Sequence, residues 1–192
     1  MKVVLATRNA GKLVEMQRLF EPIGWTLVSQ EALDVPSAPE TKPTFIENAL
    51  DKARHVAEAT GLPCIADDSG IVVEALGGAP GIYSARYAGP QRSDKDNNAK
   101  LVAELAGVDD RRAHFYCAMV FVPHANHPAP TIATAAWHGE IVDEAQGDGG
   151  FGYDPHFYLP EFGKTSAALD AATKNRLSHR GQAAAELLRK LT

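Results

Sequence analysis

The helix predicted between residues 44 and 61 constrains the fold of this chain more than any other segment. It begins at the capping box Thr44-Phe45-Ile46-Glu47, a pattern in which threonine and glutamate side chains satisfy the first backbone amides of a helix. Apolar side chains then recur along one side of the helix, at Phe45, Ala49, Ala53, Val56 and Ala57. Gly61 ends the helix, because glycine adopts the left-handed conformation of a C-terminal cap without strain.

Apolar runs before and after this helix predict β-strands. They cover residues 2–6, 25–29, 63–66, 71–73, 114–122 and 131–142. The polar segment Asp67-Asp68-Ser69-Gly70 separates two of these runs, so we expect a strand pair around a tight turn with the acids at its tip. The last two runs flank the loop Pro123–Pro130 and predict a long antiparallel pair, which forms a projecting β-rich lobe around residues 113–142.

Helical spacing of apolar residues predicts three further helices. One follows the first strand, one runs through Leu105, and one closes the chain. Ser93 or Asp94 is the expected cap of the second of these, and Ser178 or Thr173 that of the last. Prolines and glycines predict loops over residues 35–43 and 76–92.

The composition excludes several classes of protein. At 192 residues, with 45% hydrophobic and 22% charged residues, the chain suffices for one domain or two small lobes sharing a core. Its net charge of -5 provides no general positive field for the backbone of DNA or RNA, so we predict no nucleic-acid partner. Cys64 and Cys117 lie in apolar runs, which predicts buried thiols in a reducing compartment and no cysteine-based zinc site. Without a signal peptide or a membrane-spanning run, we expect a cytoplasmic protein with no membrane partner.

The loop Thr7–Lys12 is a candidate phosphate-binding site. It lies between a predicted buried strand and the start of a helix, where free backbone amides and a lysine can surround an anion. It is not a P-loop, because Ala6 stands in place of the first glycine and Leu13 in place of Ser or Thr. The alternative is a plain corner in which Gly11 makes the turn and Lys12 points into solvent.

The acidic pair Asp67 and Asp68 is a candidate for metal binding or for proton transfer. On an extended backbone the two side chains point to opposite faces, so only one enters a given site. That carboxylate could hold a hard cation or take a proton from an attacking water, and the alternative is an Asx turn. Glu40 adds a further oxygen donor, and Lys52 could face the same space from the predicted helix.

Two segments near the C-terminus combine features of a purine site. In residues 149–154, glycines permit close approach to the backbone, and aromatic rings can stack on a base. The basic residues Lys174, Arg176, His179 and Arg180 lie at or before the last helix, and Arg176 and Arg180 are expected on one helix face. The alternatives are a tight turn with core aromatics and a solvated basic turn.

Six blocks of the sequence together resemble the inosine/xanthosine triphosphate pyrophosphatase family, nearly from end to end. They are Thr7–Lys12, Thr44–Ala49, Ile65–Gly70, Gly77–Tyr87, Gly149–Pro155 and Ser178–Gly181. The resemblance implies an elongated α/β fold: a mixed twisted sheet with flanking helices and two lobes around a central cleft. We accordingly expect residues 1–192 to form one pyrophosphatase domain that assembles as a homodimer.

The resemblance also implies the roles of individual residues. Asp68 accepts the proton of the attacking water, Glu40 and Asp68 bind magnesium (Mg2+), and Ser69 contacts substrate. The triphosphate is held by Thr7, Arg8, Asn9, Ala10, Gly11, Lys12 and Lys52. The base and sugar are surrounded by Phe151, Gly152, Tyr153, Asp154, Lys174, His179 and Arg180. Arg8 departs from the small residue that many relatives carry, which leaves open whether it contacts phosphate.

The implied reaction is hydrolysis of non-canonical purine nucleoside triphosphates, ITP, dITP, XTP and dXTP, to the monophosphate and pyrophosphate. One rival is a septum-inhibitor-type nucleotide pyrophosphatase acting on modified pyrimidines, which would lack the Phe-Gly-Tyr-Asp and Ser-His-Arg blocks. Another is a nucleotide-sensing module that binds nucleotide without cutting it. Glu40 and Asp68 argue against this alternative, because a sensor has no need of a metal-held water.

Overall fold

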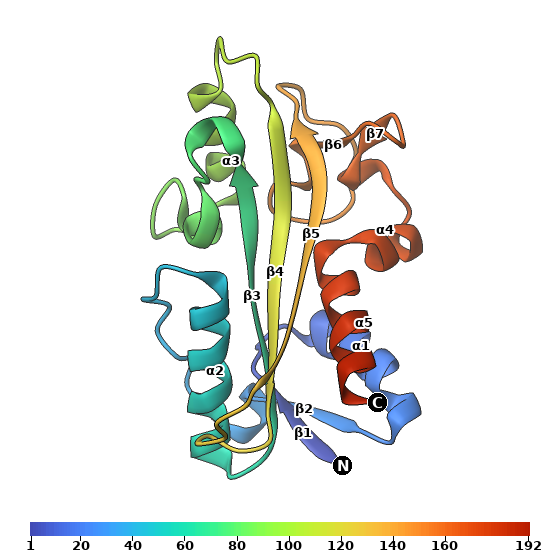
Figure 1. Cartoon of the computed structure of the whole chain (residues 1–192). Coiled ribbons are helices and arrows are strands. Elements are labelled where there is room, and N and C mark those ends of the chain that lie inside the picture. Colours follow the sequence, from blue (N-terminus) through green and yellow to red (C-terminus); the bar gives the residue numbers. More distant parts are fainter. The chain divides into compact units, whose positions relative to one another are not determined.

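The computed structural model describes residues 1–192 and contains a seven-stranded mixed sheet with helices packed against it (Figure 1). The strand order is β2-β1-β3-β4-β5-β6-β7. β1 pairs in parallel with β2 and β3, whereas β6 pairs antiparallel with β5 and β7. The strands are β1 (Lys2–Leu5), β2 (Thr26–Ser29), β3 (Cys64–Val73), β4 (Arg112–Val122), β5 (Thr131–Ile141), β6 (Phe157–Leu159) and β7 (Lys164–Thr165).

Five α-helices accompany the sheet: α1 (Ala10–Phe20), α2 (Phe45–Thr60), α3 (Asp94–Glu104), α4 (Ala171–Leu177) and α5 (His179–Leu191). The α2 helix begins as predicted, because the Thr44 side chain accepts a hydrogen bond from the Glu47 amide at 3.2 Å. It ends at Gly61, whose φ of 66° places it in the left-handed region. None of these helices combines the length and apolar composition needed to cross a bilayer.

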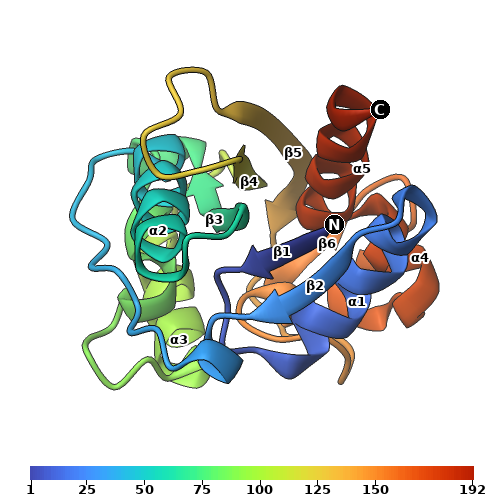
Figure 2. The same cartoon turned by 90° about the horizontal axis from the view of Figure 1, so that it is seen from below.

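The chain divides into two compact units, each with its own apolar core. Unit 1 contains residues 1–68, 117–135 and 182–192, and unit 2 contains residues 69–116 and 136–181. In unit 1, Met16, Phe20 and Leu187 pack with β-strand residues such as Ile65 and Met119, which places α1 and α5 on one face of the strands. Figure 2 shows α2 on the other side of these strands. In unit 2, Trp137, Phe157 and Leu101 belong to a separate cluster.

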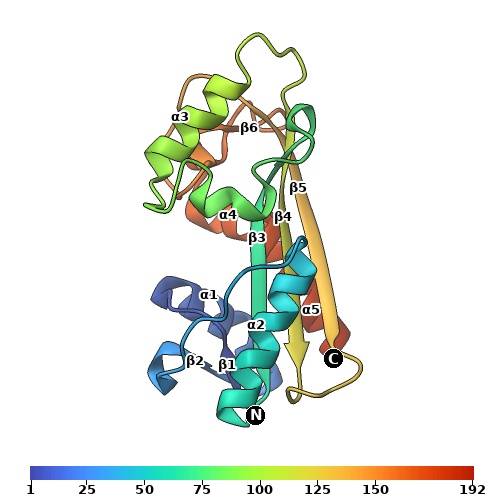
Figure 3. The same ribbon diagram turned by 90° about the vertical axis from the view of Figure 1, so that its left-hand side faces the viewer.

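The strands predicted at 114–122 and 131–142 are confirmed as β4 and β5, which run side by side and are joined by residues 123–130 (Figure 3). Ser93 is confirmed as the α3 cap, since it accepts from the Asp96 amide at 3.2 Å. Residues 76–92 contain no strand, and 3-10 turns order this loop at Glu74–Leu76 and Gly81–Arg86.

The tight turn predicted at Asp67–Gly70 is wrong, because β3 continues through it as one ten-residue strand. β3 is hydrogen-bonded to β4 in the sheet, whereas β1 pairs with it only at Cys64 and Ile65, so pairing with β4 outweighs the local turn preference of the Asp, Ser and Gly residues. The acids therefore lie in the middle of a strand rather than at the tip of a hairpin.

Candidate active site

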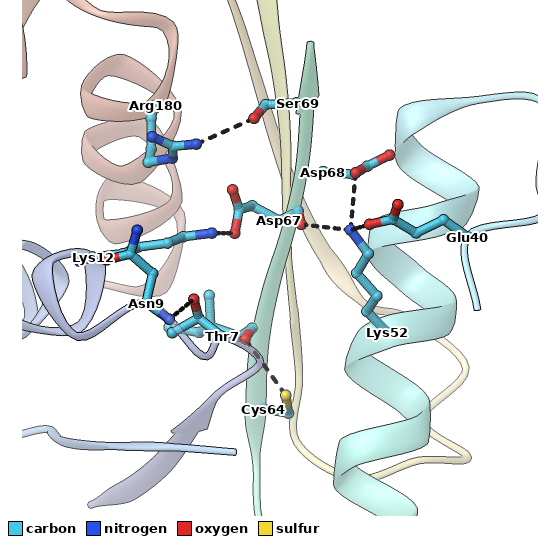
Figure 4. Close-up of polar contacts among 11 residues, drawn as sticks. Thr7, Asn9, Lys12, Glu40, Lys52, Cys64, Asp67, Asp68, Ser69 and Arg180 are labelled. Atoms are coloured by element: carbon cyan, nitrogen blue, oxygen red, sulfur yellow. Dashed lines mark hydrogen bonds and ion pairs between the residues drawn. The ribbon is translucent and has the colours of Figure 1, made fainter. Parts of the chain in front are cut away.

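Asp67 and Asp68 lie next to each other on β3 and reach in opposite directions (Figure 4). The Asp67 carboxylate is buried and accepts a hydrogen bond from the Lys12 ammonium, on the side of α1. Asp68 Oδ1 lies 2.9 Å from Lys52 Nζ, on the side of α2. The pleat of an extended strand produces this alternation, and the prediction that the two acids face opposite ways is confirmed.

Lys52 forms ion pairs with both Glu40 and Asp68 on the α2 side of the strand. Its Nζ lies 2.6 Å from Glu40 Oε1, and it donates to the Asp67 carbonyl at 3.3 Å. Burial works against the charge of Lys52, but Asp68 and Glu40 outweigh it, so the pKa of Lys52 is raised. Burial also raises the pKa of Asp68 above its usual range, although the adjacent Lys52 opposes this. A carboxylate with a raised pKa is better matched to accepting a proton near neutral pH.

The loop Thr7–Lys12 is ordered by its own side chains. Thr7 Oγ1 accepts from the Asn9 amide at 3.1 Å, and Asn9 Oδ1 accepts from the Lys12 amide at 3.1 Å, which makes Asn9 the N-cap of α1. The alternative in which Lys12 points into solvent is wrong, because its side chain is only 14% exposed and meets Asp67. Arg8 lies at the surface. Lys12 and Lys52 thus contact the same residue of β3, through its carboxylate and its carbonyl respectively.

In unit 2, Asp154 organises the glycine-rich segment. Its buried carboxylate contacts Lys174 Nζ at 2.5 Å and accepts from the Phe151 amide at 2.8 Å and the Ser166 hydroxyl at 2.7 Å. Gly150 has a φ of 79°, and a Cβ there would collide with the Asp154 carboxylate and the Lys174 ammonium. This position therefore requires glycine for both conformation and space.

The two aromatic rings of the segment have different environments. The Phe151 side chain is 63% exposed, and the Lys174 ammonium and the Arg180 guanidinium lie 5.1 Å and 5.7 Å from its ring centre. Tyr153 is buried in the core of unit 2, and its hydroxyl donates to the Ser84 carbonyl at 2.7 Å. Phe151 is therefore a surface residue of the segment, whereas the Tyr153 ring belongs to the core.

The basic cluster lies on two helices rather than one. Ser178 has an extended backbone between α4 and α5, and its hydroxyl caps α5 by accepting from the Gly181 amide at 3.1 Å. The expectation that Arg176 and Arg180 share a helix face is therefore wrong, because the helix is interrupted between them. Arg180 donates to the Ser69 hydroxyl at 3.3 Å, and the His179 ring stacks on Phe115 with centroids 4.8 Å apart.

Sequence reasoning named Asp67 but did not pair it with Lys12, and it missed two residues of α3 that support Gly152. The Asp67 carboxylate holds Lys12, which only the tertiary pairing of β3 with the start of α1 reveals. Asp94 and Asn98 of α3 bind the backbone of Gly152, since Asp94 accepts from its amide at 2.7 Å and Asn98 donates to its carbonyl at 2.8 Å. No local pattern in the sequence pairs Asp67 with Lys12 or links α3 to Gly152.

Known proteins resemble this chain over its whole length. The model of the Ham1 family matches residues 3–190. A protein of Chromobacterium violaceum named dITP/XTP pyrophosphatase is 58% identical over 99% of this chain and 96% of its own length. One of Neisseria meningitidis serogroup B with the same name is 58% identical over the same shares.

Solved structures agree with this relationship. A HAM1 protein from Coxiella burnetii superimposes with a TM-score of 0.96 at 45% identity, covering 100% of this chain and 98% of its own. The Staphylococcus aureus Ham1 protein gives a TM-score of 0.92 at 38% identity, with the same coverage. With the family match spanning nearly every residue and both structures sharing the fold, this chain belongs to the Ham1 family.

Proposed function

We propose that this protein hydrolyses the non-canonical purine nucleoside triphosphates ITP, dITP, XTP and dXTP to the monophosphate and pyrophosphate. Relatives that are more than half identical over almost their whole length are named dITP/XTP pyrophosphatase. Within this chain, the observation that carries the proposal is the meeting of Lys12 and Lys52 with the acidic pair of β3. Cleavage of a phosphoric anhydride requires both positive charge for the phosphates and a carboxylate for the attacking water.

The triphosphate tail is assigned to the loop Thr7–Lys12 and to Lys52. Both lysines are largely buried, with side chains 14% and 17% exposed, so their charge is poorly screened by solvent. Such ammonium groups stabilise the negative charge that develops on the departing pyrophosphate.

Asp68 is the proposed acceptor of the proton from the water that attacks the α-phosphorus. Its burial and raised pKa suit it to this task. Ser69, the next residue of β3, is proposed to contact the substrate.

Glu40 and Asp68 fit a hard divalent cation, which we propose is magnesium. Their oxygens already converge on one cationic nitrogen, at 2.6 Å and 2.9 Å. Magnesium is commonly held by one or two carboxylates together with the phosphates of the substrate, so two protein oxygens suffice. The bound ion would neutralise phosphate charge and polarise the phosphorus for attack.

The purine is assigned to Phe151–Asp154, Lys174, His179 and Arg180. The exposed Phe151 ring can stack on the base, and the cationic groups beside it are donors. Hypoxanthine and xanthine present a carbonyl at the 6-position, whereas adenine presents an amino group that would face these donors unfavourably. We further propose that the protein forms a homodimer. We also propose that it acts on the nucleotide pool of the cytoplasm.

The test is a metal-dependent screen of nucleoside triphosphates that separates pyrophosphate from orthophosphate. We expect pyrophosphate and monophosphate from ITP, dITP and XTP, with ATP much slower. Orthophosphate as the product would place the cut at another bond, and preference for a modified pyrimidine would favour the septum-inhibitor type.

A further inference from the structure

All three N–H donors of the Lys52 ammonium have acceptors within the protein. A protonated lysine carries three N–H donors. They face Glu40 Oε1 at 2.6 Å, Asp68 Oδ1 at 2.9 Å and the Asp67 carbonyl at 3.3 Å. The side chains of Glu40 and Asp68 are 29% and 12% exposed, and Lys52 contacts both carboxylates.

In this arrangement the Lys52 ammonium lies against the two carboxylates to which the metal ion is proposed to bind. A divalent ion on Glu40 and Asp68 would bind the same two carboxylates that Lys52 now contacts, and at such short range it would repel the Lys52 ammonium. Conversely, Lys52 can reach a phosphate only by giving up at least one of its three acceptors. A phosphate that draws the Lys52 ammonium away from Glu40 and Asp68 leaves both carboxylates to the ion.

We propose that Lys52 is an internal counter-ion that blocks the Glu40–Asp68 pair against free divalent metal and releases the pair when a phosphate tail arrives. The inference rests on the proposed function, because it takes Glu40 and Asp68 as the metal ligands. Its consequence is that metal and nucleotide enter together, since each relieves the charge that opposes the other. In the metal-free protein, Lys52 keeps two neighbouring carboxylates from repelling each other.

The experiment measures binding of Mn2+ alone, without nucleotide, by the electron paramagnetic resonance signal of the free ion. Lys52→Met keeps the length of the side chain and removes its charge. We expect this variant to bind Mn2+ at least about tenfold more tightly than the unmodified protein, the effect of removing one competing charge at ion-pair distance. We also expect its metal-free melting temperature to be lower, and Mn2+ to raise it more than in the unmodified protein.

Two further variants make the result specific. Lys42→Met removes a half-exposed lysine that pairs with Asp51 across 3.5 Å and touches neither proposed ligand, so it should leave Mn2+ affinity unchanged. Lys52→Met combined with Glu40→Gln should lose the gain. Equal Mn2+ affinity in Lys52→Met and the unmodified protein, or the same gain in Lys42→Met, would overturn the proposal.

Failure of this inference is distinguishable from failure of the proposed function. If the unmodified protein releases pyrophosphate from ITP but Lys52→Met gains no metal affinity, only the counter-ion role is rejected. If the unmodified protein releases none, the pyrophosphatase assignment itself is rejected.

Discussion

At the scale of single residues, the strand β3 separates two acids that are neighbours in the sequence. Asp67 forms an ion pair with Lys12, and Asp68 forms one with Lys52, because consecutive side chains of a strand point to opposite faces. The pair therefore provides two independent lysine contacts instead of one doubly acidic site. This geometry makes the two carboxylates separable by mutation.

We predict that Asp68→Asn lowers the turnover number for ITP by about 10²- to 10⁴-fold, the range expected for loss of a general base. The amide has the same shape, so circular dichroism and melting should show a folded protein. Asp51→Asn, at a half-exposed position of α2, is the matched control and should retain activity. Near-normal pyrophosphate release by Asp68→Asn would remove its assigned role.

We predict that His179→Ala and Lys174→Ala reduce the preference for ITP over ATP, by about ten- to a hundredfold in the ratio of kcat/KM, the effect of losing one hydrogen bond to a charged donor. Arg176→Ala removes an exposed charge from the same region and should leave the ratio unchanged. His179→Ala is the cleaner variant, because Lys174→Ala also leaves the buried Asp154 carboxylate without its cation. Unaltered ratios in both variants would exclude these residues from base selection.

At the scale of elements, helix caps were readable from the sequence and strand continuity was not. Thr44, Ser93 and Ser178 cap their helices through bonds within four residues, so local chemistry suffices to place them. The continuity of β3 through Asp67–Gly70 depends on pairing with β4, which is distant in the sequence, because β1 pairs only with Cys64 and Ile65. A segment of Asp, Ser and Gly favours a turn until such partners are present.

We predict that Thr44→Ala destabilises the protein by about 1 kcal/mol, because the Glu47 amide loses its acceptor at the start of α2. The midpoint of urea unfolding should fall while the slope stays the same. Thr44→Ser keeps the hydroxyl and should restore most of the loss. An unchanged midpoint in Thr44→Ala would show that the cap contributes nothing to stability.

At the scale of the whole molecule, two apolar cores account for most of the buried residues, and both cysteines lie in unit 1. Cys64 and Cys117 are completely buried. Burial raises the pKa of the Cys64 thiol to about 12. Since the thiolate is the reactive form, these residues report on opening of the unit 1 core.

We predict that neither thiol of the native protein reacts with a disulfide reagent at pH 8, where roughly one Cys64 in ten thousand is ionised. Because the folded pKa is raised, any residual native reaction should accelerate as pH rises toward 12. In denaturant both cysteines should be labelled. Rapid labelling of the native protein at pH 8 would show that the core opens far more readily than its packing indicates.

Features that depend on near neighbours, or on many motifs taken together, could be read from the amino-acid sequence. Four of the five helices, most strands and the family followed from local patterns and from six blocks in a fixed order, whereas α4 was not predicted. The pairing of Lys12 with Asp67 and of Lys52 with Glu40 and Asp68 joins residues up to 55 positions apart. These pairings form only in the folded chain, because a charge selects its partner by distance in space, and the sheet that sets this distance is built from remote strands.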